Sequence, residues 1–157
     1  MSLDDFLSKF IQTTDYPTLD AMQYLMKNLG SPEKKLKFVH IAGTNGKGSI
    51  CEMLNKVLML SNYKVGKFIS PHLFVSNESI CINNIQITDT EFLKYKDTFE
   101  KLSQNYFEET GRKVTRFEIL TSLAILYFSQ NNCDIVILET GLGGLYDCTN
   151  IVDSLIS

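Results

Sequence analysis

Several features that direct a protein to a membrane or out of the cell are missing from this 157-residue sequence. No stretch approaches the roughly 18 consecutive apolar residues that a membrane-spanning helix requires. The first residues, MSLDDFLSKFIQ, are acidic and lack a basic segment followed by a long apolar run, so they do not resemble a secretory signal peptide. No internal repeat and no low-complexity segment is visible. We therefore expect a globular chain with no membrane partner.

Cysteine and histidine are few and lack a metal-binding pattern. The sequence has two histidines and four cysteines. No C-x-x-C pair is present, and no group of His and Cys has the spacing of a zinc site. We expect reduced thiols and a cytoplasmic protein, because disulfides persist mainly in oxidising compartments. The cysteines are Cys51, Cys81, Cys133 and Cys148.

A large excess of charge of either sign is also missing. The 15 Lys and Arg residues against 18 Asp and Glu give a formal net charge of −3. This balance argues against a general nucleic-acid binder, and we expect no nucleic-acid partner. It does not exclude a nucleotide ligand, because one lysine and a set of backbone amides suffice to bind phosphate.

Short runs of β-branched and aliphatic residues predict three strands, over 36–42, 64–70 and 134–139. The third run, DIVILE, has four aliphatic residues in succession, which is typical of a strand buried on both faces of a parallel sheet. The alternation in SICINNIQI, around Asn83 and Asn84, predicts a β-hairpin.

Helical patterns lie between these strands. Thr88 and Thr115 each have a Glu three residues later and form capping boxes that begin helices, the first running to about residue 106. Apolar residues at helical spacing predict another helix, which follows a glycine-rich loop and ends near residue 60. One face of that helix is marked by Ile50, Leu54, Val57 and Leu58. The alternation predicts an α/β fold, with a P-loop-type parallel sheet flanked by helices.

The glycine-rich loop lies within residues 40–49, HIAGTNGKGS, between a predicted strand and a predicted helix. The start of a helix presents unpaired N–H groups and partial positive charge, which phosphate oxygens satisfy. Glycines let such a loop curl and remove the Cβ atoms that would block the approach, while a lysine adds charge for the outer phosphates. We expect phosphate to be bound by Gly43, Thr44, Asn45, Gly46, Lys47, Gly48 and Ser49.

The loop departs from the general P-loop pattern G-x-x-x-x-G-K-[ST]. Ile41 stands where the first glycine is expected, and Gly48 where a hydroxyl residue is expected. Two other interpretations of this loop therefore stay open beside the phosphate site. One is a glycine-rich turn with a solvated lysine, and the other is an unrelated P-loop kinase or NTPase.

Glu139 ends the most apolar predicted strand and is followed by glycines at 141, 143 and 144. Ligands of open α/β sheets bind beyond the carboxyl ends of the strands. A carboxylate at that end could ligate Mg²⁺ directly or through water. The plainer alternative is an exposed acid at a strand end.

Four stretches in series resemble one family. They are HIAGTNGKGS (40–49), SPHL (70–73), TRFEILT (115–121) and ETGLGGLYDCTNIVD (139–153). In order and rough spacing they are similar to the folylpolyglutamate synthase and dihydrofolate synthase enzymes of the Mur ligase superfamily. The resemblance covers nearly the whole chain from about Phe6.

The resemblance implies an ATP-dependent carbon–nitrogen ligase with ATP and Mg²⁺ as cofactors. ATP would phosphorylate a carboxylate of folate or dihydropteroate, and the amino group of glutamate would then attack the acyl phosphate. Positioning and charge neutralisation carry most of such catalysis. Lys47 and Glu139 would serve catalysis, and Ser70 and Glu139 match the family's Mg²⁺ ligands.

Three further residues match the pterin site of the family, Thr115, Phe117 and Asp147. Phe117 suits ring stacking, and Asp147 suits the amino-pyrimidine edge of a pterin. Each has a structural alternative: Phe117 as a core residue, Thr115 as a helix cap, and Asp147 as the cap of a turn. His40 is interpreted as a histidine of the core rather than a ligand.

The sequence also departs from the family. Ser79 and Leu145 stand where the family usually has arginines near the anionic substrate. Family members continue well beyond this length, so residues 1–157 are interpreted as the N-terminal portion of the ATP-binding domain, with the C-terminal ligase domain absent. A sheet of three parallel strands would leave an unpaired apolar edge, which favours self-association. The alternative function is a non-catalytic remnant that binds a nucleotide or pterin.

Overall fold

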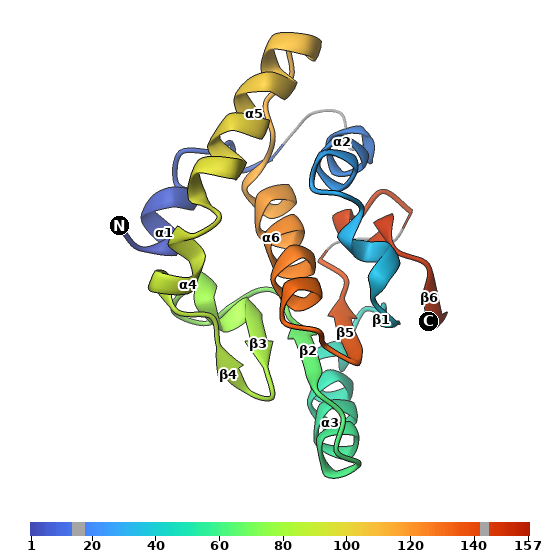
Figure 1. The fold of residues 1–157 in the computed structure, drawn as a ribbon. Coiled ribbons are helices and arrows are strands. Elements are labelled where there is room, and N and C mark those ends of the chain that lie inside the picture. The colour runs from blue at the N-terminus through green and yellow to red at the C-terminus, as the bar shows by residue number, and fades with distance from the viewer. Residues whose placement is uncertain (14–17, 142–144) are drawn as a thin grey trace.

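The computed structural model describes residues 1–13, 18–141 and 145–157, which form a mixed sheet with helices on both faces (Figure 1). Within these residues, six strands have the order β4-β3-β2-β5-β1-β6. The strands are β1 Phe38–Ile41, β2 Val65–Phe68, β3 Ile80–Ile82, β4 Ile85–Gln86, β5 Ile135–Glu139 and β6 Ser154–Ile156. The predicted α/β fold with a largely parallel sheet is confirmed.

The parallel part of the sheet is larger than predicted. Strands β1, β2 and β5 are the three predicted ones, and β5 lies between the other two. Strand β6 adds a fourth parallel strand beside β1, so the expectation of only three was wrong. Its three residues are too few to show a periodic pattern. The side chains of Leu155 and Ile156 on this edge strand are exposed, and self-association through the edge stays a prediction.

The predicted hairpin is confirmed as β3 and β4, which pair antiparallel. Its turn residues, Asn83 and Asn84, have φ values of 48° and 65°. Two successive residues with positive φ are typical of a type I′ turn, whose twist matches that of the paired strands. The side chain of Asn83 also accepts a hydrogen bond from the backbone N–H of Val65, at 2.9 Å.

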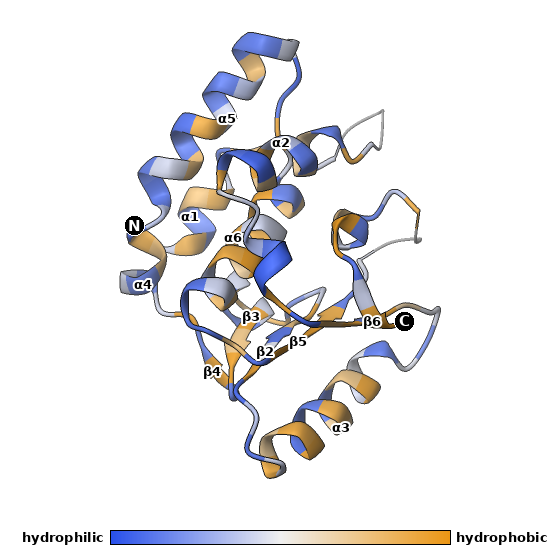
Figure 2. Ribbon diagram, turned by 45° about the vertical axis from the view of Figure 1, so that its right-hand side comes forward, coloured by the Kyte–Doolittle hydropathy of each residue, from blue (hydrophilic) through white to orange (hydrophobic). Residues whose placement is uncertain are grey.

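Helices cover the two faces of the sheet unequally. The α-helices are α1 Leu3–Leu7, α2 Asp20–Asn28, α3 Lys47–Leu60, α4 Asp89–Leu93, α5 Lys96–Thr110 and α6 Arg116–Gln130. Three short 3₁₀ helices are η1 Pro32–Lys35, η2 Ser76–Ser79 and η3 Cys148–Ile151. Figure 2 shows α3 on one side of the sheet and α1, α2, α5 and α6 on the other. None of the helices in these ranges is long and apolar enough to cross a membrane.

The helix predicted from Thr88 to about residue 106 is two helices, α4 and α5, so its continuity was wrong. The chain turns at Tyr95, which is buried. The hydroxyl of Tyr95 donates to Gln130 Oε1 at 2.8 Å. This contact holds the bend against the end of α6. Because Gln130 is distant from Tyr95 in the sequence, no local pattern indicates the bend.

The larger core lies between the sheet and helices α1, α2, α5 and α6, and a smaller one lies under α3. Leu54 and Leu58 of α3 pack into the smaller core, as the predicted apolar face requires. Ile50 and Val57 do not, since about half of each side chain is exposed. Helix α3 therefore has apolar residues on its solvent side as well, which its sequence spacing alone does not separate from the buried ones.

Candidate nucleotide and substrate site

The carboxyl ends of three parallel strands meet at one edge of the sheet. In register, Glu139 of β5 lies beside Ile41 of β1, and Leu138 lies beside Phe68 of β2. The chain leaves β1 into the glycine-rich loop and leaves β2 toward Ser70. This is where ligands bind in open α/β sheets, because the loops after neighbouring strands diverge there.

The glycine-rich loop turns directly into the first turn of α3. Gly43 and Gly46 have φ values of 140° and 80°, a region that favours glycine, and Gly46 is the N-cap of α3. Gly46 therefore allows the chain to turn so that the first amides of the helix face outward. Every predicted phosphate-binding residue, Gly43 to Ser49, lies on this loop or in the first helical turn, and all but the half-buried Lys47 are exposed. The Nζ atom of Lys47 donates to the carbonyl oxygen of Gly43 at 2.9 Å.

Glu139 and Ser70, predicted from separate motifs, lie together. The backbone N–H of Ser70 donates to Glu139 Oε2 at 3.3 Å. Burial raises the pKa of Glu139, while the hydrogen bond from Ser70 and the positive charge of Lys47 act in the opposite direction. The loop after β1 and the carboxylate of Glu139 lie at neighbouring strand ends, because Ile41 pairs with Glu139.

The hydroxyl of Ser70 is the strongest sign that this site fits a cation. Its Oγ atom is buried and has no hydrogen-bond partner among the residues that the structure describes. A buried oxygen without a partner is energetically costly, and a cation beside it would remove that cost. Together with the carboxylate of Glu139 it gives two hard oxygen donors.

Two oxygen donors are too few for a metal site made of protein ligands alone, but they suit magnesium. No cluster of three or more His, Cys, Asp or Glu side chains suited to a metal occurs in the described parts of the chain. Mg²⁺ is usually held by one or two protein ligands, several waters and the phosphates of a substrate. Ser70 and Glu139 would therefore complete a metal site only with a nucleotide on the glycine-rich loop.

Two of the predicted substrate residues converge on Gly141, two positions after Glu139. A Cβ atom on Gly141 would lie 2.8 Å from Phe117 Cζ and 3.1 Å from Asp147 Oδ2. The backbone N–H of Gly141 donates to Asp147 Oδ2 at 3.0 Å. The ring of Phe117 also lies 5.9 Å from that of Phe68, between centroids. An aromatic face and a carboxylate are thus held beside the strand end that carries Glu139.

Thr115 contributes to the start of α6. Its hydroxyl accepts from the backbone N–H of Glu118 at 3.2 Å and donates to Glu118 Oε2 at 2.8 Å. The predicted capping box is therefore confirmed. It fixes the helix start two residues before Phe117, and so helps to position that ring.

Proteins of known function match this chain in sequence and in structure. The dihydrofolate synthase/folylpolyglutamate synthase of Bacillus subtilis is 42% identical over 146 residues, which cover 90% of this chain and 33% of that protein. The folylpolyglutamate synthase of Thermotoga maritima matches with a TM-score of 0.89 at 36% identity, covering 98% of this chain and 35% of that one. A complex of FPGS with AMPPCP and folate matches with a TM-score of 0.89 at 28% identity, covering 99% and 39% respectively.

This chain is similar in sequence and in structure to dihydrofolate and folylpolyglutamate synthases. The resemblance inferred from the four motifs is confirmed, although no family model matches the chain. The chain spans about a third of the length of the curated synthases that it matches.

Ser79 and Leu145, which stand where the sequence analysis expects arginines, have different surroundings. Ser79 is buried, and its hydroxyl has no hydrogen-bond partner within the described ranges. Leu145 is exposed. Two further residues expected near the site, Gly143 and Gly144, lie outside the described residues.

The sequence analysis did not single out Thr149, which lies next to the predicted substrate residue Asp147. Its hydroxyl lies 2.8 Å from His40 Nε2, and it bonds to Asp147 Oδ1 through both its backbone N–H and its hydroxyl. Thr149 occurs within the motif at 139–153, but its contact with β1 spans more than a hundred residues. The interpretation of His40 as a buried histidine of the strand is confirmed.

Proposed function

We propose that residues 1–157 form the N-terminal portion of the ATP-binding domain of an ATP-dependent carbon–nitrogen ligase. The reaction joins glutamate to a carboxylate of folate or dihydropteroate through an acyl phosphate. One observation carries this proposal: Ser70, whose hydroxyl is buried and has no partner among the described residues, donates its backbone N–H to Glu139, and Glu139 pairs in register with Ile41, after which the glycine-rich loop begins. The relatives support it, since one solved FPGS holds AMPPCP and folate.

The residues have separate tasks in this reaction. Backbone N–H groups of the glycine-rich loop would bind the phosphate oxygens of ATP, and Lys47 would add a positive charge there. Ser70 and Glu139 would hold Mg²⁺, which supplies neutralisation of the charge that develops on the transferred phosphoryl group. Phe117 would stack on the pterin ring, and Asp147 would face its amino-pyrimidine edge. The free cysteines found in the structure fit a reducing, cytoplasmic compartment.

The first half of the reaction can be tested without the glutamate site. The carboxylate of dihydropteroate would attack the γ-phosphorus of ATP, giving an acyl phosphate and ADP. Added hydroxylamine would then displace phosphate and form a stable hydroxamate. Incubation of the chain with Mg-ATP, dihydropteroate and hydroxylamine should yield ADP and dihydropteroyl hydroxamate in equal amounts, as measured by mass spectrometry.

Each outcome of that assay has a definite meaning. Hydroxamate that requires both ATP and the chain supports the ligase. Saturable binding of Mg-ATP or dihydropteroate without hydroxamate indicates the alternative, a non-catalytic binding module. If the folded chain binds neither compound, the proposal is overturned.

A further inference from the structure

Three residues from two distant parts of the chain form a continuous line of hydrogen bonds beside the site. His40 lies on β1, three residues before Gly43 of the glycine-rich loop, and Thr149 lies on η3. The imidazole Nε2 of His40 lies 2.8 Å from Thr149 Oγ1. Thr149 Oγ1 in turn donates to Asp147 Oδ1. All three side chains are buried, so water does not compete strongly for these contacts.

The proton on His40 follows from counting donors. A threonine hydroxyl carries one proton, and here it is given to Asp147. The backbone N–H of Thr149 also donates to the same carboxylate oxygen, at 2.9 Å, so that oxygen acts as an acceptor. Thr149 Oγ1 can therefore only accept from His40, whose ring must carry a proton on Nε2. Burial lowers the pKa of His40, although the charge of Asp147 opposes this, and a lowered pKa favours the neutral ring.

The line of hydrogen bonds ends at the loop that carries the substrate residues. Asp147 Oδ1 is held by Thr149, which leaves Oδ2 directed at the backbone N–H of Gly141, at 3.0 Å. Gly141 in turn contacts Phe117. A change in the orientation of the Asp147 carboxylate would therefore move both the acid and the peptide next to the aromatic ring.

We infer that His40 is a positioning residue: its Nε2–H orients Thr149, and Thr149 fixes the Asp147 carboxylate and, through it, Gly141. The line joins the strand that leads into the glycine-rich loop to the loop on the substrate side. The side chain of His40 is buried and hydrogen-bonds to Thr149, so we assign its effect on the site to Thr149 rather than to contact with a substrate. The contact of Asp147 with a pterin rests on the proposed function. The hydrogen bonds from His40 through Thr149 to Asp147 are independent of it.

Matched variants at two positions separate hydrogen bonding from packing. His40→Gln keeps an N–H donor near the position of Nε2, whereas His40→Leu removes it at similar size. Thr149→Ser keeps the hydroxyl, whereas Thr149→Val removes it without changing the shape. Amide hydrogen exchange of Gly141, followed by NMR, reports on the bond to Asp147. The amide of Thr140, which donates to Ile41 O at 3.0 Å, is the control for an intact sheet.

We expect the ring nitrogens of His40 to show the Nε2–H tautomer in the unaltered chain. Exchange of the Gly141 amide should be about tenfold faster in His40→Leu and Thr149→Val, and close to the original rate in His40→Gln and Thr149→Ser. The Thr140 amide should stay protected in all four. If His40→Leu does not fold, the inference is still tested by the tautomer of His40 and by the comparison of Thr149→Ser with Thr149→Val.

Three results would overturn the inference. They are a proton on Nδ1 of His40, an unchanged Gly141 rate in a folded Thr149→Val, and equal effects of His40→Gln and His40→Leu. Titration with dihydropteroate is a separate arm, in which Thr149→Val should bind about tenfold more weakly than Thr149→Ser. If the unaltered chain does not bind dihydropteroate, the substrate assignment fails while the exchange data still test the line.

Discussion

Replacing Glu139 by Gln is expected to weaken Mg-ATP binding by roughly 10–100-fold, which corresponds to the loss of one charged interaction. Gln is close to Glu in shape and can still accept the hydrogen bond from Ser70, so the sheet end should keep its geometry. What the substitution removes is the negative charge that would attract the cation. Calorimetric titration of Mg-ATP into both proteins measures the difference.

The same substitution should make the ligand-free chain more stable. Burial raises the pKa of Glu139 in the folded state above its value in the unfolded state. At neutral pH the ionised carboxylate therefore opposes folding, and this cost disappears as the pH falls through the raised pKa. Glu139→Gln should unfold at a midpoint higher by about 2–4 °C at pH 7, for a gain of roughly 1 kcal/mol. The gain over the unaltered chain should shrink on acidification.

The matched control is Glu108→Gln, on the exposed side of α5. It makes the same chemical change far from the strand ends and should leave both Mg-ATP binding and the unfolding midpoint nearly unchanged. A folded Glu139→Gln that binds Mg-ATP as tightly as the Glu108 variant would show that Glu139 does not serve the cation.

Replacing Phe128 by Ala is expected to lower the free energy of unfolding by about 3–5 kcal/mol. The ring is fully buried on α6. It lies so close to β2 that a Cβ atom on Gly66 would be 2.8 Å from Phe128 Cγ. Glycine at 66 therefore allows the ring to pack against the strand, and Gly66 itself has no side chain to fill the space that the ring would leave. Urea unfolding of both proteins, with equal m-values, measures the loss.

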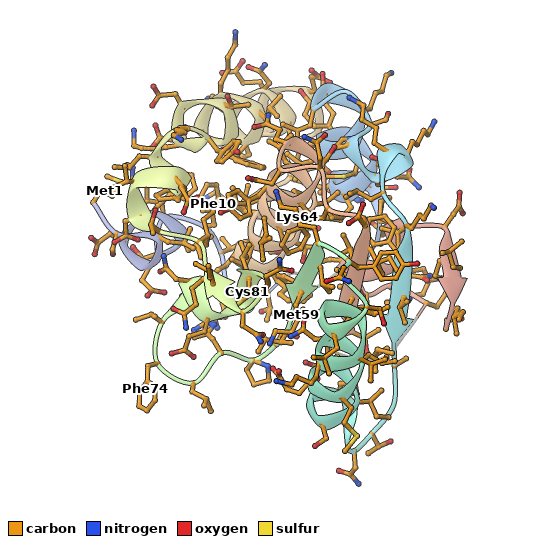
Figure 3. The ribbon with its side chains drawn as sticks, turned by 60° about the horizontal axis from the view of Figure 1, so that its bottom comes forward. Met1, Phe10, Met59, Lys64, Phe74 and Cys81 are labelled. Carbon is orange, nitrogen blue, oxygen red and sulfur yellow. The ribbon has the colours of Figure 1, made fainter. Side chains whose placement is uncertain are left out.

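Phe74→Ala is the matched control for that loss. Its side chain is 86% exposed, and Figure 3 shows it at the periphery, directed away from the body of the protein. The same atoms are deleted without leaving a cavity, so the expected change is within about 0.5 kcal/mol. Equal losses in the two variants would contradict the packing of α6 on β2 described above.

Local sequence signals predicted those parts of the fold that depend on neighbouring residues. Three such features are formed by residues that are close together in the sequence. They are the capping box of Thr115 and Glu118, the turn at Asn83 and Asn84, and the loop before α3. Such features form from backbone geometry and short-range hydrogen bonds. The pairing of Ser70 with Glu139 was predicted only because separate motifs resembled one family.

The features that the sequence did not predict depend on distant partners. Strand β6 exists because β1 offers it a pairing edge, and the bend between α4 and α5 exists because Tyr95 reaches Gln130. The contact of His40 with Thr149 likewise requires the sheet and η3 to be in place. Tertiary contacts of this kind override local propensity, and a single sequence does not show them.

The most direct test of the nucleotide site is a calorimetric titration of Mg-ATP into this chain and into Lys47→Ala, with Lys56→Ala as the control. Lys56 is an exposed lysine of the same helix, two turns beyond the glycine-rich loop. We expect saturable binding to the unaltered chain and to Lys56→Ala, and binding weaker by roughly 10–100-fold in Lys47→Ala. Absence of binding by the folded, unaltered chain, or equal losses in the two lysine variants, would contradict this expectation.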